Sequence, residues 1–291
     1  MQERVAELIR AFDVLDGSYK REEVDAALAL QKEITPHLLE ILHDVARDPA
    51  AYVEEDHFAN TYAAILLAHF REPEAYLPLV RAFCIPEEER EDIWGDMVTV
   101  TLPALLYQTC NGSFDAIKEL ASNKEVSFYV RAAALDAIEY AVGFGVLPRE
   151  EVLEYFTGLF TGEEADRDSD FWSNLVTIIC DIHPEGALET IRRAYEDGLV
   201  SPGFVGLHEV ERELARDKGE VLAELREHVQ RCVPADIHEY CSWFSCFQES
   251  DDGLLSMPAP GAGKRGTKGV KKSPNRKKNK MARKSRKRNK R

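Results

Sequence analysis

The stretch Val130-Arg131-Ala132-Ala133-Ala134-Leu135-Asp136-Ala137-Ile138 places apolar side chains at the spacing of an α-helix that is buried over most of its surface. A turn follows at residues 143–148, and the apolar positions within residues 152–156 then mark an amphipathic second helix. A single helical hairpin of this kind cannot bury both of its apolar faces. The pattern therefore predicts that the hairpin packs between similar neighbours.

The same order of apolar helix, turn and amphipathic helix occurs four times along the chain. The four units open on the aromatic residues Phe58, Trp94, Tyr129 and Phe171, which lie 36, 35 and 42 residues apart. Stacked units of this length bury a continuous core between them. Strand signals are almost absent. The sequence therefore predicts an all-α fold, an α-solenoid of stacked helical hairpins.

Two prolines predict interruptions of helices. Thr35-Pro36 is typical of a cap followed by proline at the first helical position, so we expect one helix over residues 21–34 and another over residues 37–45. Pro103 lies inside the first helix of the second unit and predicts a kink there.

The segments around and after the fourth unit differ from the repeating pattern. An acidic surface loop is expected at residues 162–170, before the fourth unit. Two closing helices are expected over residues 207–215 and 220–229. The aromatic-rich segment 237–247 is then expected to pack as an end cap.

The charge of the chain is divided between an acidic body and a basic tail. Residues 253–291 hold 16 Lys and Arg and no Asp or Glu, while residues 1–252 hold 21 basic and 52 acidic side chains, a net charge of −31. The tail has too few apolar residues to offset the entropy of ordering its backbone. We therefore expect a solenoid domain over residues 1–249 and a disordered tail over residues 250–291.

Several classes of protein are excluded by composition. No apolar run reaches the roughly 18 residues that a membrane-spanning helix needs, and the first seven residues form a charged helical pattern rather than a signal peptide. The six cysteines contain no Cys-x-x-Cys pair, which indicates reduced thiols. We expect a cytoplasmic protein with no membrane partner.

Parts of the sequence resemble known helical families. The stretch 130–138 resembles the core of HEAT-like repeats, and residues 72–79 resemble the turn and second helix of the same class. Residues 34–39, Pro184 to Val200 and Tyr240 to Phe247 resemble an uncharacterised bacterial HEAT-like family, domain-of-unknown-function family eleven-eighty-six. The resemblance covers roughly residues 20–247 and implies an all-helical fold with no established activity.

Members of that family often end in a SEC-C motif, a small zinc-binding segment rich in cysteine. Residues 258–265, Pro-Ala-Pro-Gly-Ala-Gly-Lys-Arg, resemble this motif without its cysteines, with Ala259 at the place of the first. Zinc requires thiolate or imidazole ligands, and residues 248–291 contain none. The resemblance therefore implies basic charge at this place without the metal.

The basic tail is the strongest functional signal. A Lys/Arg run binds phosphate by neutralising its charge, without reading the nucleotide sequence. Because the tail has no aromatic residue, contact with RNA, a ribosome or DNA would be sensitive to salt and tolerant of sequence. The alternative is a solvated tail that folds back on the acidic body. The residues that would bind nucleic acid are Arg276, Lys277, Lys278, Lys280, Arg283, Lys284, Arg286, Lys287, Arg288, Lys290 and Arg291.

A cluster of histidine and cysteine residues is the candidate for a metal site. His228, Cys232, His238, Cys241 and Cys246 lie close in sequence, but their spacing does not match a standard zinc site, and buried thiols packed among aromatic residues explain them better. We therefore expect no metal and no cofactor.

Asp181-x-His183 is able to form an acid–base pair, but it ends an apolar helix just before Pro184, where a histidine more often caps the last carbonyls. Arg131 is either an exposed ligand contact or, as we prefer, a bridge from one repeat to a carboxylate or turn carbonyl of the next. Neither pattern predicts an enzyme.

Carboxylates on the second helices suggest a surface for a basic partner. Singly they are ordinary solvated side chains, but together on one concave wall they would attract a positively charged protein. We therefore expect a non-enzymatic interaction scaffold, with an RNA- or ribosome-associated protein as the alternative. The carboxylates are Glu150, Glu151, Glu154, Glu189 and Glu196.

Overall fold

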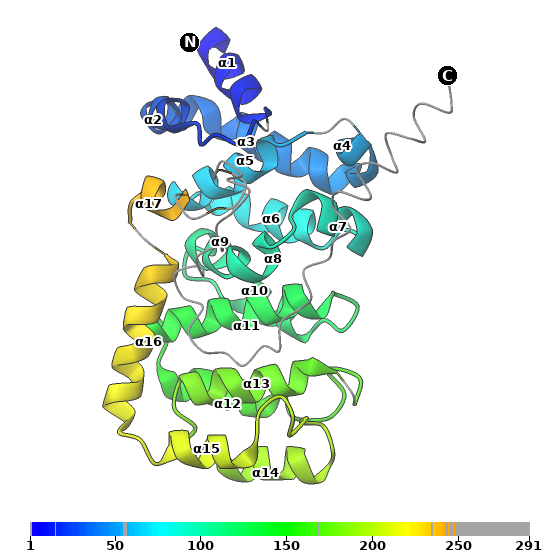
Figure 1. Cartoon of the computed structure of the whole chain (residues 1–291), viewed down its shortest axis with the longest axis vertical. Coiled ribbons are helices and arrows are strands. Elements are labelled where there is room, and N and C mark those ends of the chain that lie inside the picture. Colours follow the sequence, from blue (N-terminus) through cyan, green and yellow to red (C-terminus); the bar gives the residue numbers. More distant parts are fainter. Residues whose placement is uncertain are drawn as a thin grey trace, which may run out of the picture.

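The fold is entirely helical in the part of the chain that the structure describes. The computed structural model describes residues 2–14, 16–54, 57–167, 169–233, 235–241, 244 and 247. These residues form seventeen α-helices and one short 3-10 helix, and they contain no strand (Figure 1). The all-α prediction is confirmed. The tail from residue 250 onward, predicted to be disordered, lies outside the described residues.

Four helices precede the first repeating unit. They are α1 (Gln2–Phe12), α2 (Arg21–Ala29), α3 (Gln31–Arg47) and α4 (Pro49–Glu54). Asp13, after α1, fastens this group to the first unit, because its Oδ1 accepts from the backbone N–H groups of Phe58 and Ala59 at 2.8 and 3.1 Å. Burial opposes ionisation of Asp13, but these hydrogen bonds and the ring of His57 outweigh it and hold the pKa of this carboxyl below its usual value.

The predicted boundary at Thr35-Pro36 is wrong, because Pro36 lies inside α3. The chain breaks earlier, at Leu30, and the Thr35 hydroxyl donates to the carbonyl of Gln31 at 2.7 Å rather than capping a helix. Proline removes one backbone donor from the helix. Helix formation is favoured nevertheless, because α3 buries Ile34 and Leu38 completely on either side of Pro36.

The four predicted units are present, and each is a helical hairpin. Positive backbone φ angles at Arg71, Asn111 and His183 close three of the turns. As Pro103 predicted, the first helix of the second unit is interrupted. The helices are α5 (Ala59–His69), η1 (Pro73–Ala75) and α6 (Tyr76–Phe83); α7 (Glu87–Ile93), which connects to α8 (Met97–Val100), α9 (Leu102–Thr109) and α10 (Asp115–Ser122); α11 (Phe128–Gly143) and α12 (Arg149–Gly158); and α13 (Asp170–Asp181) and α14 (Leu188–Glu196).

The first helices of the units stack on one another. Helix α5 packs on α9, α9 on α11, and α11 on α13, which gives the elongated stack seen in Figure 1. Trp94 stacks on Phe83 with 4.0 Å between ring centroids, and Phe171 and Trp172 are completely buried between the third and fourth units. Burial of such side chains against neighbouring units is what stabilises a repeat stack.

The helices after the fourth unit turn the chain back along the stack. They are α15 (Leu207–Leu214), α16 (Lys218–Cys232) and α17 (Ile237–Cys241). Helix α15 packs on α13 and α14, but α16 runs past α13 and α11, and α17 contacts α5 (Figure 1). The two closing helices are therefore confirmed, and α16 crosses the ends of the first helices.

The aromatic segment after α16 does not cap the far end of the stack, so that prediction is wrong. The ring of Phe247 lies 5.4 Å from that of Tyr19 and 5.2 Å from that of Tyr62, beside α5. The ring of His238 is hydrogen-bonded to the Tyr19 hydroxyl at 2.8 Å and to Asp25 at 3.0 Å. Because α16 runs back along the stack, the chain that follows it reaches the N-terminal end, where Phe247 packs against Tyr19 and Tyr62.

Candidate binding groove

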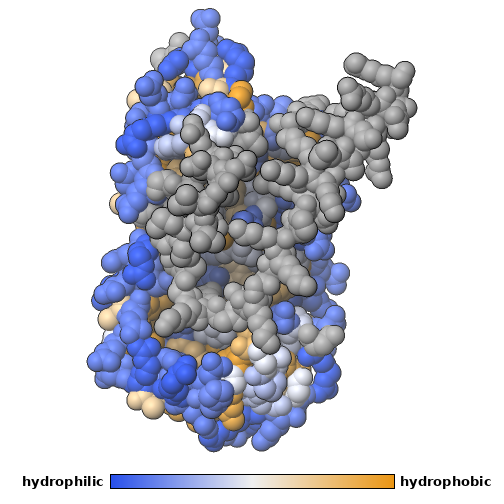
Figure 2. All heavy atoms as spheres, in the orientation of Figure 1, coloured by the Kyte–Doolittle hydropathy of each residue, from blue (hydrophilic) through white to orange (hydrophobic). Residues whose placement is uncertain are grey.

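A large open groove lies between the first helices of the later units and α16. Its volume is about 820 Å³. Residues of α11, α13 and α15 line one side and residues of α16 the other. Figure 2 shows hydrophilic residues along both long edges of the molecule and apolar residues between them in the half that holds these helices. The lining residues are Thr99, Phe128, Tyr129, Ala132, Ala133, Asp136, Glu139, Asn174, Thr177, Cys180, Asp181, Phe204, Val205, Glu209, Glu213, Arg216, Val221, Glu224, Leu225, Glu227, His228 and Arg231.

The groove is strongly acidic. Its lining contains Arg216 and Arg231 as the basic residues of fixed charge, and Arg216 is already engaged with carboxylates. Arg216 donates to Glu224 and, at 2.9 Å, to Glu213, and these two hydrogen bonds raise the pKa of Arg216 above its usual value. The remaining negative charge favours a cationic ligand. The seven carboxylates of the groove are Asp136, Glu139, Asp181, Glu209, Glu213, Glu224 and Glu227.

The floor of the groove presents polar groups from buried positions. Glu139 on α11 is completely buried, and Asp136 lies one turn before it. The Nδ2 nitrogen of Asn174, on the adjacent α13, lies below the surface without a hydrogen-bond partner in the described part of the chain.

The carboxylates also act on Cys180, a thiol in the groove. Burial, together with the negative charges of Asp181, Glu213 and Glu209, raises the pKa of Cys180 to about 12. The thiol is therefore protonated at neutral pH, and a protonated thiol is a poor nucleophile. The groove is electrostatically suited to binding cations rather than to thiol chemistry.

Aromatic side chains give the groove an apolar component. Tyr129 of α11 is 44% exposed and Phe204, before α15, is 38% exposed, although both are large apolar side chains. They belong to the same lining as the carboxylates. Exposed aromatic residues beside charged ones are typical of protein-binding surfaces.

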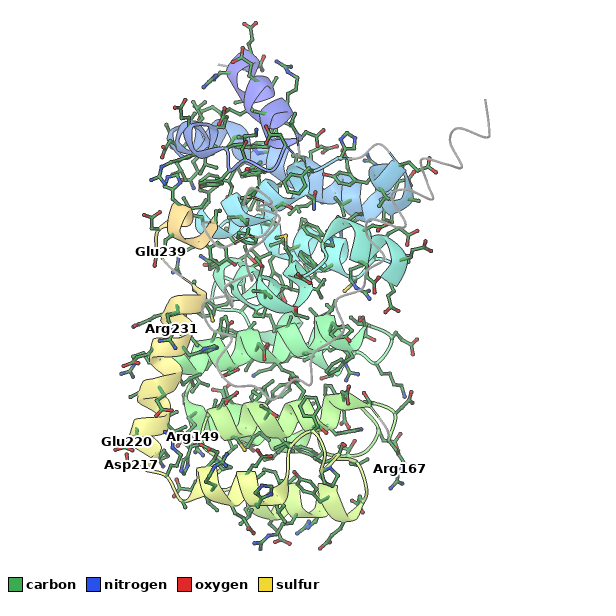
Figure 3. All side chains as sticks on the ribbon, viewed as in Figure 1. Arg149, Arg167, Asp217, Glu220, Arg231 and Glu239 are labelled. Carbon is green, nitrogen blue, oxygen red and sulfur yellow. The ribbon has the colours of Figure 1, made fainter. Side chains whose placement is uncertain are left out.

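The position of α16 depends on the absence of a side chain at Gly143, the last residue of α11. A Cβ atom there would lie 2.7 Å from Cγ2 of Val229 and 3.3 Å from Cγ of Leu225. Asp217 caps the start of α16 by accepting from the N–H of Glu220 at 3.0 Å. Figure 3 shows Asp217 and Arg231 towards opposite ends of this helix. Asp217 thus sets where α16 begins, and Gly143 allows α16 to approach α11 closely.

The turn that follows α13 is held by the buried side chain of Arg149. Its Nε donates to the carbonyl of Ile182 at 2.7 Å, and its Nη2 donates to the carbonyls of His183 and Glu185, the latter at 2.8 Å. His183 does not cap these carbonyls, contrary to the interpretation from sequence, and its Nε2 lies 3.2 Å from the carbonyl of Arg216. Arg149 therefore fixes the end of α13, where Asp181 enters the groove.

Arg131 bridges two repeats, as preferred from sequence. Its Nε donates to the carbonyl of Ala121 at 2.8 Å, and its guanidinium lies 4.1 Å from the centroid of the Phe171 ring. The contact to a carbonyl at the end of α10 and the cation–π contact to α13 both serve packing. Arg131 is 3% exposed, which does not suit a ligand contact.

The five carboxylates proposed from sequence lie elsewhere. Glu150, Glu151 and Glu154 are exposed on α12, and Glu189 and Glu196 are exposed on α14. None of the five lines the groove, which is built from the first helices and α16. The groove carboxylates were missed, although the spacing Asp136-x-x-Glu139 within an otherwise apolar helix was a usable signal. A role for the five outer carboxylates in partner binding stays a prediction.

Two of the candidate metal ligands have other partners in the structure. His238 pairs with Tyr19 and Asp25, whereas the Sγ of Cys232 lies 3.6 Å from the Nε2 of His228. Cys246 and the proposed nucleic-acid contacts at 276–291 lie outside the described residues. Among the described residues, no group of three or more His, Cys, Asp or Glu side chains is arranged to hold a metal ion.

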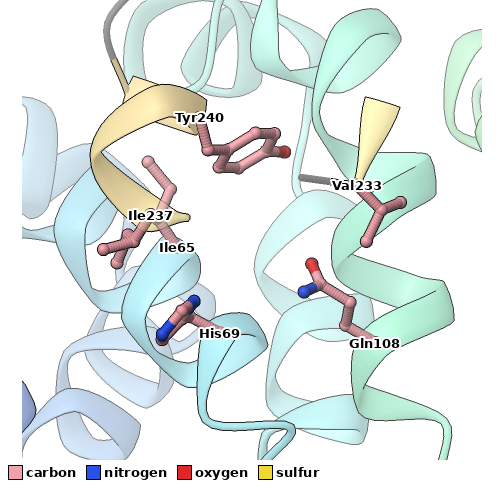
Figure 4. A pocket seen from close by; sticks show the side chains of 6 residues that line it. All are labelled: Ile65, His69, Gln108, Val233, Ile237 and Tyr240. Carbon is pink, nitrogen blue, oxygen red and sulfur yellow. The ribbon is translucent and has the colours of Figure 1, made fainter. Parts of the chain in front are cut away.

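A second cavity is too small for an organic ligand. It lies where α17 and the end of α16 meet α5 and α9, and its volume of about 10 Å³ is close to that of one water molecule (Figure 4). Burial lowers the pKa of His69, one of its lining residues. The groove is therefore the better candidate site.

The fold and the groove define the class of protein: an all-helical stack of hairpins with an acidic groove. The chain belongs to the family described as "Protein of unknown function (DUF1186)", whose profile matches residues 3–248. An uncharacterized protein of Chlamydia trachomatis serovar D is 31% identical over 197 residues, 67% of this chain and 78% of that protein. An uncharacterized protein of Chlamydia muridarum is equally similar over 79% of its length.

Comparison with solved structures gives no significant match. A search of the described helices for a segment long and apolar enough to cross a bilayer also finds none. The family match ends at residue 248, so the basic tail lies outside it.

Proposed function

We propose that this protein is a non-enzymatic interaction scaffold that binds a basic segment of another polypeptide in the groove between α11, α13, α15 and α16. The observation that carries the proposal is the combination of seven carboxylates with exposed aromatic side chains in one groove of about 820 Å³. Such a lining suits an amphipathic partner whose Lys or Arg residues meet carboxylates and whose apolar residues meet Tyr129 and Phe204.

The chemistry of the groove supports binding rather than catalysis. Arg216 is held by two carboxylates, and the Cys180 thiol is protonated at neutral pH. Neither side chain is thus available as a free catalytic cation or as a nucleophile. The proposed function is therefore binding alone, without a chemical reaction in the groove.

The test compares two variants that change the charge equally. One neutralises five groove carboxylates and the other neutralises the five outer carboxylates, both in the full-length chain. The probe is a fluorescent helical peptide of about 14 Leu and Lys residues, roughly four turns. The groove variant carries Asp136→Asn, Asp181→Asn, Glu213→Gln, Glu224→Gln and Glu227→Gln, and the control carries Glu150→Gln, Glu151→Gln, Glu154→Gln, Glu189→Gln and Glu196→Gln.

We expect the groove variant to bind the peptide at least about tenfold more weakly than the native chain, because close charge pairs carry coupling energies of this size or larger. The control is expected to bind within about twofold of the native chain, since its five carboxylates lie on α12 and α14, outside the groove lining. Circular dichroism establishes that both variants fold. Equal weakening in both would mean that only net charge matters and would contradict a site in the groove.

A further inference from the structure

We infer that residues 264–291, the Lys/Arg part of the chain's own tail, dock in the acidic groove and are the occupant that a partner must displace. The inference rests on the proposed function, because it assigns an internal competitor to the same site. Charge is its first support. The groove carries seven carboxylates and two arginines, while the tail carries 16 Lys and Arg and no acidic residue.

The length of the tail is its second support. The last described residue, Phe247, lies beside Tyr62 of α5. From α5 the contacts pass through α9 to α11 and then to α13, three helix spacings or roughly 30 Å. The 16 residues between Phe247 and Lys264 make 17 residue steps, which span up to about 60 Å when extended. The basic residues therefore reach the whole groove without any movement of the helices.

Covalent connection makes even weak docking effective. A connection of this length holds the tail at an effective concentration in the millimolar range, so an intrinsic dissociation constant of about 1 mM already gives substantial occupancy. The attraction is mainly electrostatic, because the tail has no aromatic residue to place against Tyr129 or Phe204. An amphipathic basic partner makes both kinds of contact and is thus able to displace the tail.

The first experiment maps where the tail lies, by zero-length carbodiimide crosslinking of the native full-length chain. This reagent joins a lysine amine to a carboxylate that touches it. A mixture of unlabelled and ¹⁵N-labelled chain separates links within one molecule from links between molecules. We expect tail lysines to be linked to Glu213, Glu224 and Glu227 at least about fivefold more often than to the outer carboxylates, and the links to fall at about 1 M salt.

The outer carboxylates are a demanding control, because they are well exposed. The side chains of Glu150, Glu151 and Glu189 are 73%, 53% and 72% exposed. A tail that contacted the acidic body at random would therefore react with them at least as readily. Frequent links to these residues, or links found only between molecules, would overturn the inference.

The second experiment measures competition with the same Leu/Lys peptide and with RNA. Replacing the tail's Lys and Arg residues by Gln is expected to strengthen peptide binding about fivefold or more, because the groove is vacated. Neutralising the groove carboxylates is expected to strengthen binding of a uridine oligomer of about 20 nucleotides, because the tail is released for phosphate. Unchanged RNA binding would mean that the tail is already free, which overturns docking in favour of nucleic-acid contact.

The outcomes separate this inference from the function on which it rests. If peptide binding depends on the groove carboxylates but not on the charge of the tail, the scaffold proposal stands and tail docking fails. If peptide binding depends on neither, the scaffold proposal fails as well.

Discussion

Replacing Arg149 by methionine is expected to lower the free energy of unfolding by about 3 kcal/mol or more. Methionine keeps most of the volume of the side chain but none of its donors. The carbonyls of Ile182, His183 and Glu185 would then lose their partner in a site where Arg149 is only 7% exposed. Urea denaturation followed by circular dichroism measures the loss.

The matched control is Arg192→Met, which removes an arginine from an exposed ion pair. Arg192 donates to Glu211 at 3.0 Å, and both side chains are nearly half exposed. Such pairs contribute at most about 1 kcal/mol. A similar small change in both variants would show that Arg149 does not hold the turn after α13.

Gly143→Ala is expected to destabilise the chain by about 1–3 kcal/mol, although alanine normally favours a helix over glycine. The added methyl group would overlap Val229, whose branched side chain has little freedom to move away. Helix α16 would be displaced from α11, and binding of the basic peptide would weaken with it. Denaturation and the peptide titration on the same variant measure both effects.

Gly158 in α12 provides the opposite case, because a Cβ there meets nothing within 4 Å. Gly158→Ala is therefore expected to be neutral or to stabilise by up to about 1 kcal/mol. Adding Val229→Ala to Gly143→Ala should recover part of the loss by making room for the methyl group. A Gly143→Ala chain as stable as Gly158→Ala would contradict the close approach of α16.

The sequence predicted the repeating hairpins because their signals are local. An apolar helix, a turn and an amphipathic helix follow one another within each unit, and residues such as Asn111 and Gly112, which adopt positive φ angles in the turn of the second unit, are typical of turns. The interruption at Pro103 was also predicted from a local signal, the proline itself. The helix boundary predicted at Pro36 was wrong because the burial of Ile34 and Leu38 against other helices outweighs the lost hydrogen bond. That burial depends on distant segments and cannot be recognised within residues 31–47 alone.

The groove was not predicted, because it forms between segments far apart in sequence. Asp136 and Glu227 line one site only because α16 turns back along the stack after α15. The charge of Glu150 and Glu189 was read correctly as exposed, but it lies on the second helices, which contribute nothing to the lining. A basic partner was thus expected from composition, whereas the groove proposed as its binding site is defined by the path of α16.

Amide hydrogen exchange of the full-length chain with its tail Lys and Arg replaced by Gln, which leaves the groove vacant, tests most directly whether a basic polypeptide occupies the groove when measured with and without saturating Leu/Lys peptide. We predict slower exchange in residues 128–139, 174–181 and 213–231 when the peptide is added, and no change in residues 149–158 and 188–196. Protection confined to α12 and α14, or no protection at all at saturation, would contradict this prediction.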